Sequence, residues 1–67
     1  MHFNQYCRVK LNTDKYINKG VGIGSVGYII EVYVEGSLEY EVEFSNPATG
    51  ESLAQIVVTE EEIEIAE

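Results

Sequence analysis

Residues 24–44 read GSVGYIIEVYVEGSLEYEVEF, two apolar, β-branched and aromatic runs separated by the short break Glu35-Gly36-Ser37. Val, Ile, Tyr and Phe suit a pleated, half-buried strand, and a glycine in a three-residue break can take the positive φ that a tight return needs. The pattern therefore predicts a long antiparallel hairpin, around which the rest of the chain is organised.

The second arm of this hairpin alternates between apolar residues and glutamates. The members are Leu38, Tyr40, Val42 and Phe44 on one parity and Glu39, Glu41 and Glu43 on the other. Because successive side chains of a strand point to opposite faces, one face enters the core and the other presents a row of carboxylates about 6.6 to 6.8 Å apart. We call Glu39, Glu41 and Glu43 the acidic row. A neighbouring strand lies about 4.8 Å away, which can bring Glu31 or Glu51 alongside the row.

The first arm, Val26 to Val34, alternates imperfectly, because Ile29 and Tyr33 fall on the parity opposite to the other apolar residues. Such a strand is typically long and bent. Tyr6, Tyr28 and Tyr33 could form an aromatic platform for a base or a methylated side chain. Without basic surroundings, packing beneath a long loop is the favoured interpretation.

The composition predicts one small acidic domain spanning residues 1–67. Twelve acidic residues against four basic ones give a formal charge of −8, while 45% hydrophobic residues exclude a disordered tail. A surface this negative repels nucleic acid and anionic membranes and attracts a basic partner. A core this small leaves little room for a cofactor, so we expect a protein partner and no cofactor.

The single cysteine, Cys7, cannot form an internal disulfide, which fits a reducing compartment. The start, MHFNQYCRVK, has no apolar signal region, and no stretch approaches the roughly 20 apolar residues of a membrane span. We therefore expect a complete cytoplasmic protein. Cys7 has no basic cluster nearby and is interpreted as a buried structural thiol, and His2 as an exposed terminal residue without metal-ligand spacing.

Before the hairpin, residues 1–5 are expected to be a loose lead-in to a first strand from Tyr6 to Leu11, with Cys7, Val9 and Leu11 facing inward. Residues 12–24, NTDKYINKGVGIG, lack a helical period and predict a long loop. Its glycines resemble those of phosphate-binding loops, but such loops open a helix and a strand follows here. The glycines are better suited to bends and close backbone approach.

After the hairpin, SNPATG at residues 45–50 predicts a turn. A fourth strand is expected at residues 51–58, with Leu53, Ile56 and Val58 buried. Thr59-Glu60-Glu61-Glu62 has the spacing of a capping box and predicts a single helical turn. Residues 63–65 then form a short last strand.

These elements predict an all-β fold, a small five-stranded SH3-like barrel with one helical turn before the last strand. Closure of the barrel is expected to remove exposed strand edges. The absence of tryptophan and of an ALYDY signature excludes a peptide-binding SH3 domain proper.

GSVGYIIEVY, YEVEF and IVVTEEEIE together resemble a family of small, largely uncharacterised bacterial proteins with the pattern G-x-x-G-x-I-x-E-V-Y, Y-x-V-E-F and a closing acidic T-x-x-x-I. The resemblance extends from about Lys10 to Ile65, and its motifs specify strands and turns more than chemistry. Members of this family tend to be encoded beside polymorphic or contact-dependent toxin genes, which implies an immunity role by association.

We therefore expect a cytoplasmic immunity protein that neutralises a cognate toxin, most simply a basic nuclease. The expected partner-binding residues are Glu39, Glu41, Glu43, Glu31 and Glu51. The alternatives are an accessory barrel in a larger assembly, a nucleic-acid-associated module disfavoured by charge, and a face that only confers solubility. Solvent-facing carboxylates lack the divergent pKa values of an acid–base pair, so no enzyme activity is expected. No loop of calcium-binding type occurs, so no metal site is expected either.

Overall fold

The computed structural model describes residues 3–66, which form one five-stranded antiparallel sheet. The strands are β1 (Arg8–Leu11), β2 (Val26–Tyr33), β3 (Glu39–Ser45), β4 (Ser52–Thr59) and β5 (Ile63–Ile65). Two short 3-10 helices, η1 (Ile17–Lys19) and η2 (Glu60–Glu62), complete the order of elements. The predicted all-β fold with five strands and one helical turn before the last strand is confirmed. The expectation for His2 lies outside the described residues.

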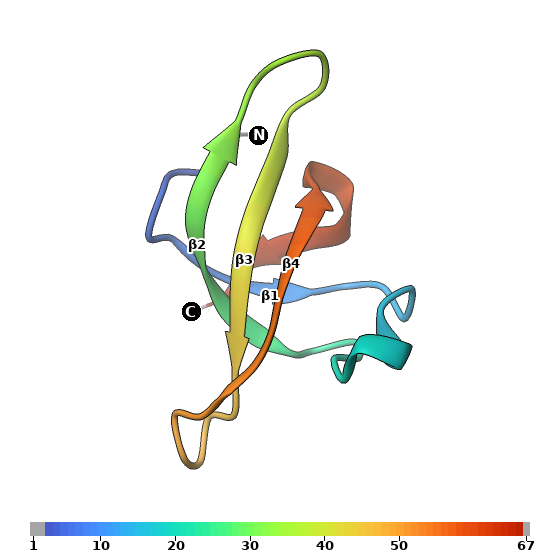
Figure 1. Ribbon diagram of the computed structural model, residues 1–67, viewed down its shortest axis with the longest axis vertical. Coiled ribbons are helices and arrows are strands. Elements are labelled where there is room, and N and C mark those ends of the chain that lie inside the picture. The colour runs from blue at the N-terminus through green and yellow to red at the C-terminus, as the bar shows by residue number, and fades with distance from the viewer. Residues whose placement is uncertain (1–2, 67) are drawn as a thin grey trace.

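The strands follow the order β4-β3-β2-β1-β5 across the sheet. In Figure 1, β2, β3 and β4 run side by side along the long axis, while β1 crosses behind them. Within residues 3–66 no ladder joins β4 to β5, so the sheet curls without hydrogen-bonded closure. The expectation that closure removes the strand edges therefore does not hold.

The core lies on the inner face of this curled sheet, and β3 is its centre. Tyr40, Val42 and Phe44 are fully buried, as their alternation predicts. The buried hydrophobic residues are Phe3, Val9, Leu11, Val21, Ile29, Tyr40, Val42, Phe44, Ile56, Val58 and Ile63. Every strand contributes to this set, because each places at least one parity of side chains inside.

Two β-bulges change which residues face the core. In β2 the pairing passes from Ile29 with Val42 to Glu31 with Glu41, so Ile30 is the extra residue. Ile29 is buried and Ile30 is not, which explains the imperfect alternation and the predicted bend. The second bulge lies in β4, close to the turn that joins it to β3. There Phe44 pairs with Ala54, but Ser45 pairs with Ser52.

Leu53 is the extra residue of this second bulge, and its side chain is 44% exposed. The expectation that Leu53 is buried is therefore wrong, because Ala54, Ile56 and Val58 share the inward parity. The other two residues expected inside, Ile56 and Val58, are buried.

The N-terminal lead-in contributes to the core rather than lying loose. Phe3 is buried and packs edge-on against the Tyr40 ring, with the ring centroids 5.5 Å apart. Its backbone N–H also donates to the Tyr40 hydroxyl at 3.1 Å. The expectation of a loose lead-in is wrong at Phe3, because β3 buries a tyrosine whose hydroxyl needs a partner.

The predicted long loop between β1 and β2 is confirmed and is tied to the capping turn η2. The Tyr16 hydroxyl donates to Glu62 at 2.8 Å, and the Lys15 ammonium pairs with the same carboxylate at 3.2 Å. Val21, in the same loop, is buried in the core. Glu62 also accepts the Thr59 N–H at 2.9 Å, which is the back-reach of the predicted capping box.

Replacing Glu62 with glutamine should lower the free energy of unfolding by about 1 kcal/mol at neutral pH, because hydrogen bonds to a charged acceptor contribute about that much more than those to a neutral one. Burial alone raises the pKa of Glu62, but hydrogen bonds from Thr59, Tyr16 and Lys15 outweigh it and hold the pKa below its ordinary value. A lowered folded-state pKa gives stability that is present above the unfolded pKa and lost as pH falls through the folded one. Urea unfolding at several pH values should therefore show wild type and variant converging in acid; a difference independent of pH would contradict this account.

Candidate functional site

The candidate site is the solvent-facing side of β2, β3 and β4, which we call the outer face. The strand register aligns nine of its residues in three sets that run across the strands. From β2 to β4 these sets are Tyr28, Glu43 and Gln55; Glu31, Glu41 and Val57; and Tyr33, Glu39 and Thr59. The three glutamates of the acidic row therefore occupy the central strand of the face.

The acidic row points outward, as the alternation of β3 predicts. Glu43 is exposed, whereas Glu39 and Glu41 are half-buried by their neighbours on β2 and β4. Glu31 joins the row because it lies directly opposite Glu41. Glu51 does not: it precedes β4 at the end of the turn, where its carbonyl accepts the Asn46 N–H. The residue opposite Glu43 on β4 is Gln55.

Glu41 is the most strongly positioned member of the row. Its two carboxylate oxygens accept hydrogen bonds from the Tyr33 hydroxyl and from the Gln55 side-chain amide, each at 2.5 Å. The bond from Tyr33, followed by that from Gln55, lowers the pKa of Glu41. The hydrogen bond between Tyr33 and Glu41 also raises the pKa of the Tyr33 hydroxyl, which stays protonated and can donate. Glu41 is thus a fixed anion at neutral pH, held from both adjacent strands.

Glu31 and Glu41 form a cross-strand pair of like charges on this face. Like charges directly opposite each other in an antiparallel pair are destabilising. A cation placed between them from outside would replace this repulsion with attraction. The cations Lys10 and Lys15 pair with Glu64 and Glu62, which lie outside the outer face.

Apolar and aromatic side chains flank the carboxylates. Tyr28, Tyr33 and Val57 are between 42% and 49% exposed on the outer face. Tyr6, Tyr28 and Tyr33 do not pack beneath the long loop, so that interpretation is wrong; Tyr6 is 72% exposed in the turn before β1. The tyrosines of β2 instead frame the acidic row, and tyrosine is a residue type enriched in protein interfaces.

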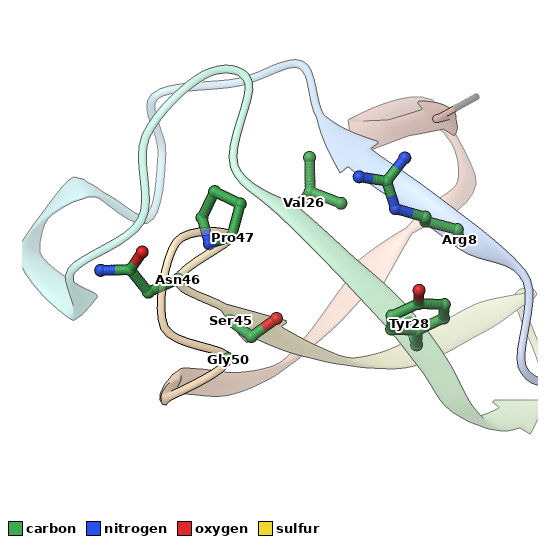
Figure 2. Close-up of a pocket in the computed structure, with 7 residues that line it drawn as sticks. All are labelled: Arg8, Val26, Tyr28, Ser45, Asn46, Pro47 and Gly50. Atoms are coloured by element: carbon green, nitrogen blue, oxygen red, sulfur yellow. The ribbon is translucent and has the colours of Figure 1, made fainter.

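A hollow of about 220 Å³ adjoins the outer face at Tyr28. Figure 2 shows its walls: Arg8, Val26 and Tyr28 lie along β1 and β2, and the turn after β3 lies opposite them. Ser45 at the end of β3, with Asn46, Pro47 and Gly50 in the turn, completes the lining. Sequence reasoning missed this hollow, because its lining comes from segments far apart in the chain and no local pattern brings them together.

Cys7 is half-buried and packs against the core, and its thiol lies 3.8 Å from the Arg8 carbonyl oxygen. Across residues 3–66 no cluster of three metal-ligating side chains occurs. No helix within that range is long and apolar enough to cross a membrane.

Comparison with known families gives one match, which covers nearly all of the chain. The model of a domain of unknown function, DUF4926, matches residues 7–65. The chain belongs to the DUF4926 family. The match contains all five strands, and it agrees with the predicted resemblance to an uncharacterised family. No curated protein and no solved structure matches the chain. For this DUF4926 domain, function must therefore be argued from the outer face itself.

Proposed function

We propose that this DUF4926 domain is an immunity protein that binds and neutralises a basic protein toxin through its outer face. The observation that carries the proposal is the acidic row with Glu41 fixed between Tyr33 and Gln55. A carboxylate that is already oriented loses little further freedom when a partner binds, so more of its interaction energy appears as affinity. The target class follows from charge, since a net charge of −8 favours a cationic partner.

The toxin is most simply a basic nuclease. Such an enzyme binds the phosphates of its substrate with Arg and Lys, and a row of carboxylates on a stiff strand can occupy the same groups. Glu31 and Glu41 provide two anions side by side, which suits a guanidinium with two or more donors. Bound in this way, the outer face excludes substrate without any chemical step.

The flanking residues supply the apolar part of the contact. Tyr28, Tyr33 and Val57 expose rings and methyl groups beside the charges, and buried aromatic residues often dominate binding energy at interfaces. The charges then contribute mainly to the rate of encounter and to specificity, while the apolar residues slow dissociation.

Capture of the partner tests the proposal. The purified chain is immobilised and exposed to extract from the cells that encode it, and bound proteins are identified by mass spectrometry. The expected result is a basic protein that the free chain inhibits in a nuclease or growth assay. Capture of an acidic or neutral protein as the sole partner would contradict the proposal.

The competing function is that of an accessory domain that holds a larger assembly together. The exposed apolar residues of the outer face favour this function, because they could pack against a permanent partner. Salt separates the two functions. Association with a basic toxin should weaken as ionic strength rises, because exposed charges are then screened. An assembly contact made through Tyr28, Tyr33 and Val57 should be nearly insensitive to salt.

A further inference from the structure

Among the described strands, the eight-residue β4 pairs only with β3 and forms the free edge of the sheet. Within residues 3–66, the backbone hydrogen bonds of residues 52–58 lead to β3 and to no other element. The outward half of the backbone N–H and C=O groups of β4 is therefore available to another strand.

The composition of β4 leaves most of this edge unprotected. Its sequence, SLAQIVVT, contains no charge and no proline, and the one protective irregularity is the bulge at Leu53, near its N-terminal end. The opposite edge differs: β5 has three residues, and Glu64 at its centre pairs with Lys10. Leu53 and Val57 add exposed apolar surface along β4. This contrast between the edges indicates that β4, and not β5, accepts a strand.

We propose that a second copy of this chain adds to β4, antiparallel, about a two-fold axis at Gln55. In that register Leu53 lies opposite Val57 of the second copy, and Gln55 lies opposite its own equivalent. The outward parity of both strands is kept, so the buried residues Ile56 and Val58 stay on the core side. A two-fold contact of one patch with itself is the commonest way in which identical chains pair.

The glutamates at the two ends of β4 select this register over its neighbour. With the axis at Gln55, Glu51 faces Thr59 of the second copy, and Glu60 faces Gly50. Moving the axis to Ile56 would keep the parity but place Glu51 opposite Glu61 of the second copy, a repulsive pair. The axis at Gln55 therefore gives a self-complementary arrangement in which no two glutamates face each other.

The proposed pairing is independent of the proposed toxin binding and has the opposite response to salt. Each copy carries a formal charge of −8, so the copies repel at low ionic strength. Screening reduces this repulsion, and dimerisation should strengthen as salt is added. Binding of a basic toxin should weaken over the same range. Failure of one proposal therefore leaves the other untouched.

Engineered cysteines test the axis directly. Gln55→Cys is made in a Cys7→Ser background, and Leu53→Cys in the same background is the matched control, since both native side chains are exposed. Opposed residues of antiparallel strands have Cα atoms about 4.5 to 5.5 Å apart, within disulfide reach, whereas Leu53 and its equivalent are displaced by four residues along the strand. Oxidised glutathione converts two facing thiols into one disulfide and is itself reduced.

The expected result is on the order of tenfold more disulfide-linked dimer from the Gln55→Cys variant than from the Leu53→Cys variant, since held thiols react faster than colliding ones. The yield should rise with salt. Equal yields from both variants, or no dimer from Gln55→Cys, would overturn the proposal. Sedimentation of the unmodified chain gives a second measurement that needs no variant to fold: a monomer at every protein and salt concentration would also overturn it.

Discussion

A Gly27→Ala substitution should remove most of the free energy of unfolding of this domain. A Cβ at this position would lie 2.4 Å from the backbone oxygen of Glu43 and 2.9 Å from Cγ1 of Val42, so β2 and β3 would have to separate. Overpacking costs about 1 to 3 kcal/mol and sometimes more. The cost is highest where the clash is with the backbone, because backbone atoms can move aside less than the end of a side chain. We expect a loss of about 3 kcal/mol, against a net stability of roughly 3 to 5 kcal/mol for a domain of this size.

Gly22→Ala is the matched control for this substitution. A Cβ at Gly22 would meet only Cδ1 of Ile17, at an ordinary 3.5 Å. Its free energy of unfolding should stay within about 0.5 kcal/mol of the wild-type value. Urea unfolding followed by circular dichroism measures both variants. Equal stability of the two variants would contradict this prediction, because it would mean that the distance between β2 and β3 at Gly27 leaves room for a Cβ.

The double reversal Glu41→Lys with Glu43→Lys should slow association with the captured toxin by about 10- to 100-fold at low salt, the range over which charge steering acts. Both side chains lie on the outer face, so the core is unchanged and the protein should remain folded. Lysine at position 41 cannot accept the hydrogen bonds that Tyr33 and Gln55 donate to Glu41, so the centre of the face becomes less ordered. Surface plasmon resonance measures the association rate, and circular dichroism checks the fold.

The control for this reversal changes the same amount of charge elsewhere. Glu35→Lys with Glu61→Lys also takes the net charge from −8 to −8 + 4 = −4, but Glu35 lies in the β2–β3 loop and Glu61 in η2. If net charge alone governs binding, both double variants should slow association equally. The outer-face account instead predicts a much smaller effect for the control.

Prediction from sequence succeeded where a local pattern carries the information. The strict alternation of β3 correctly placed Tyr40, Val42 and Phe44 inside and the acidic row outside. The Thr59–Glu62 cap was also predictable, because its partners are three residues apart. Prediction failed at the bulges, since one extra residue reverses parity without a distinctive sequence. Leu53 was misplaced for this reason.

Only part of the candidate site was predictable. Glu51 was expected beside the acidic row, but it precedes β4 at the end of the turn, opposite Asn46, and Gln55 lies opposite Glu43. The hydrogen bonds of Glu41 to Tyr33 and Gln55 depend on this register across three strands, which periodicity within one strand cannot supply.

The most direct test of the central claim is the association rate of the wild-type chain and both double variants with the captured toxin, measured as salt is raised. The account predicts a fast wild-type rate that falls steeply with salt, a control rate close to it, and a slow rate with little salt dependence for Glu41→Lys with Glu43→Lys. A wild-type rate that does not change with salt, or an outer-face variant that binds as fast as the control, would contradict it.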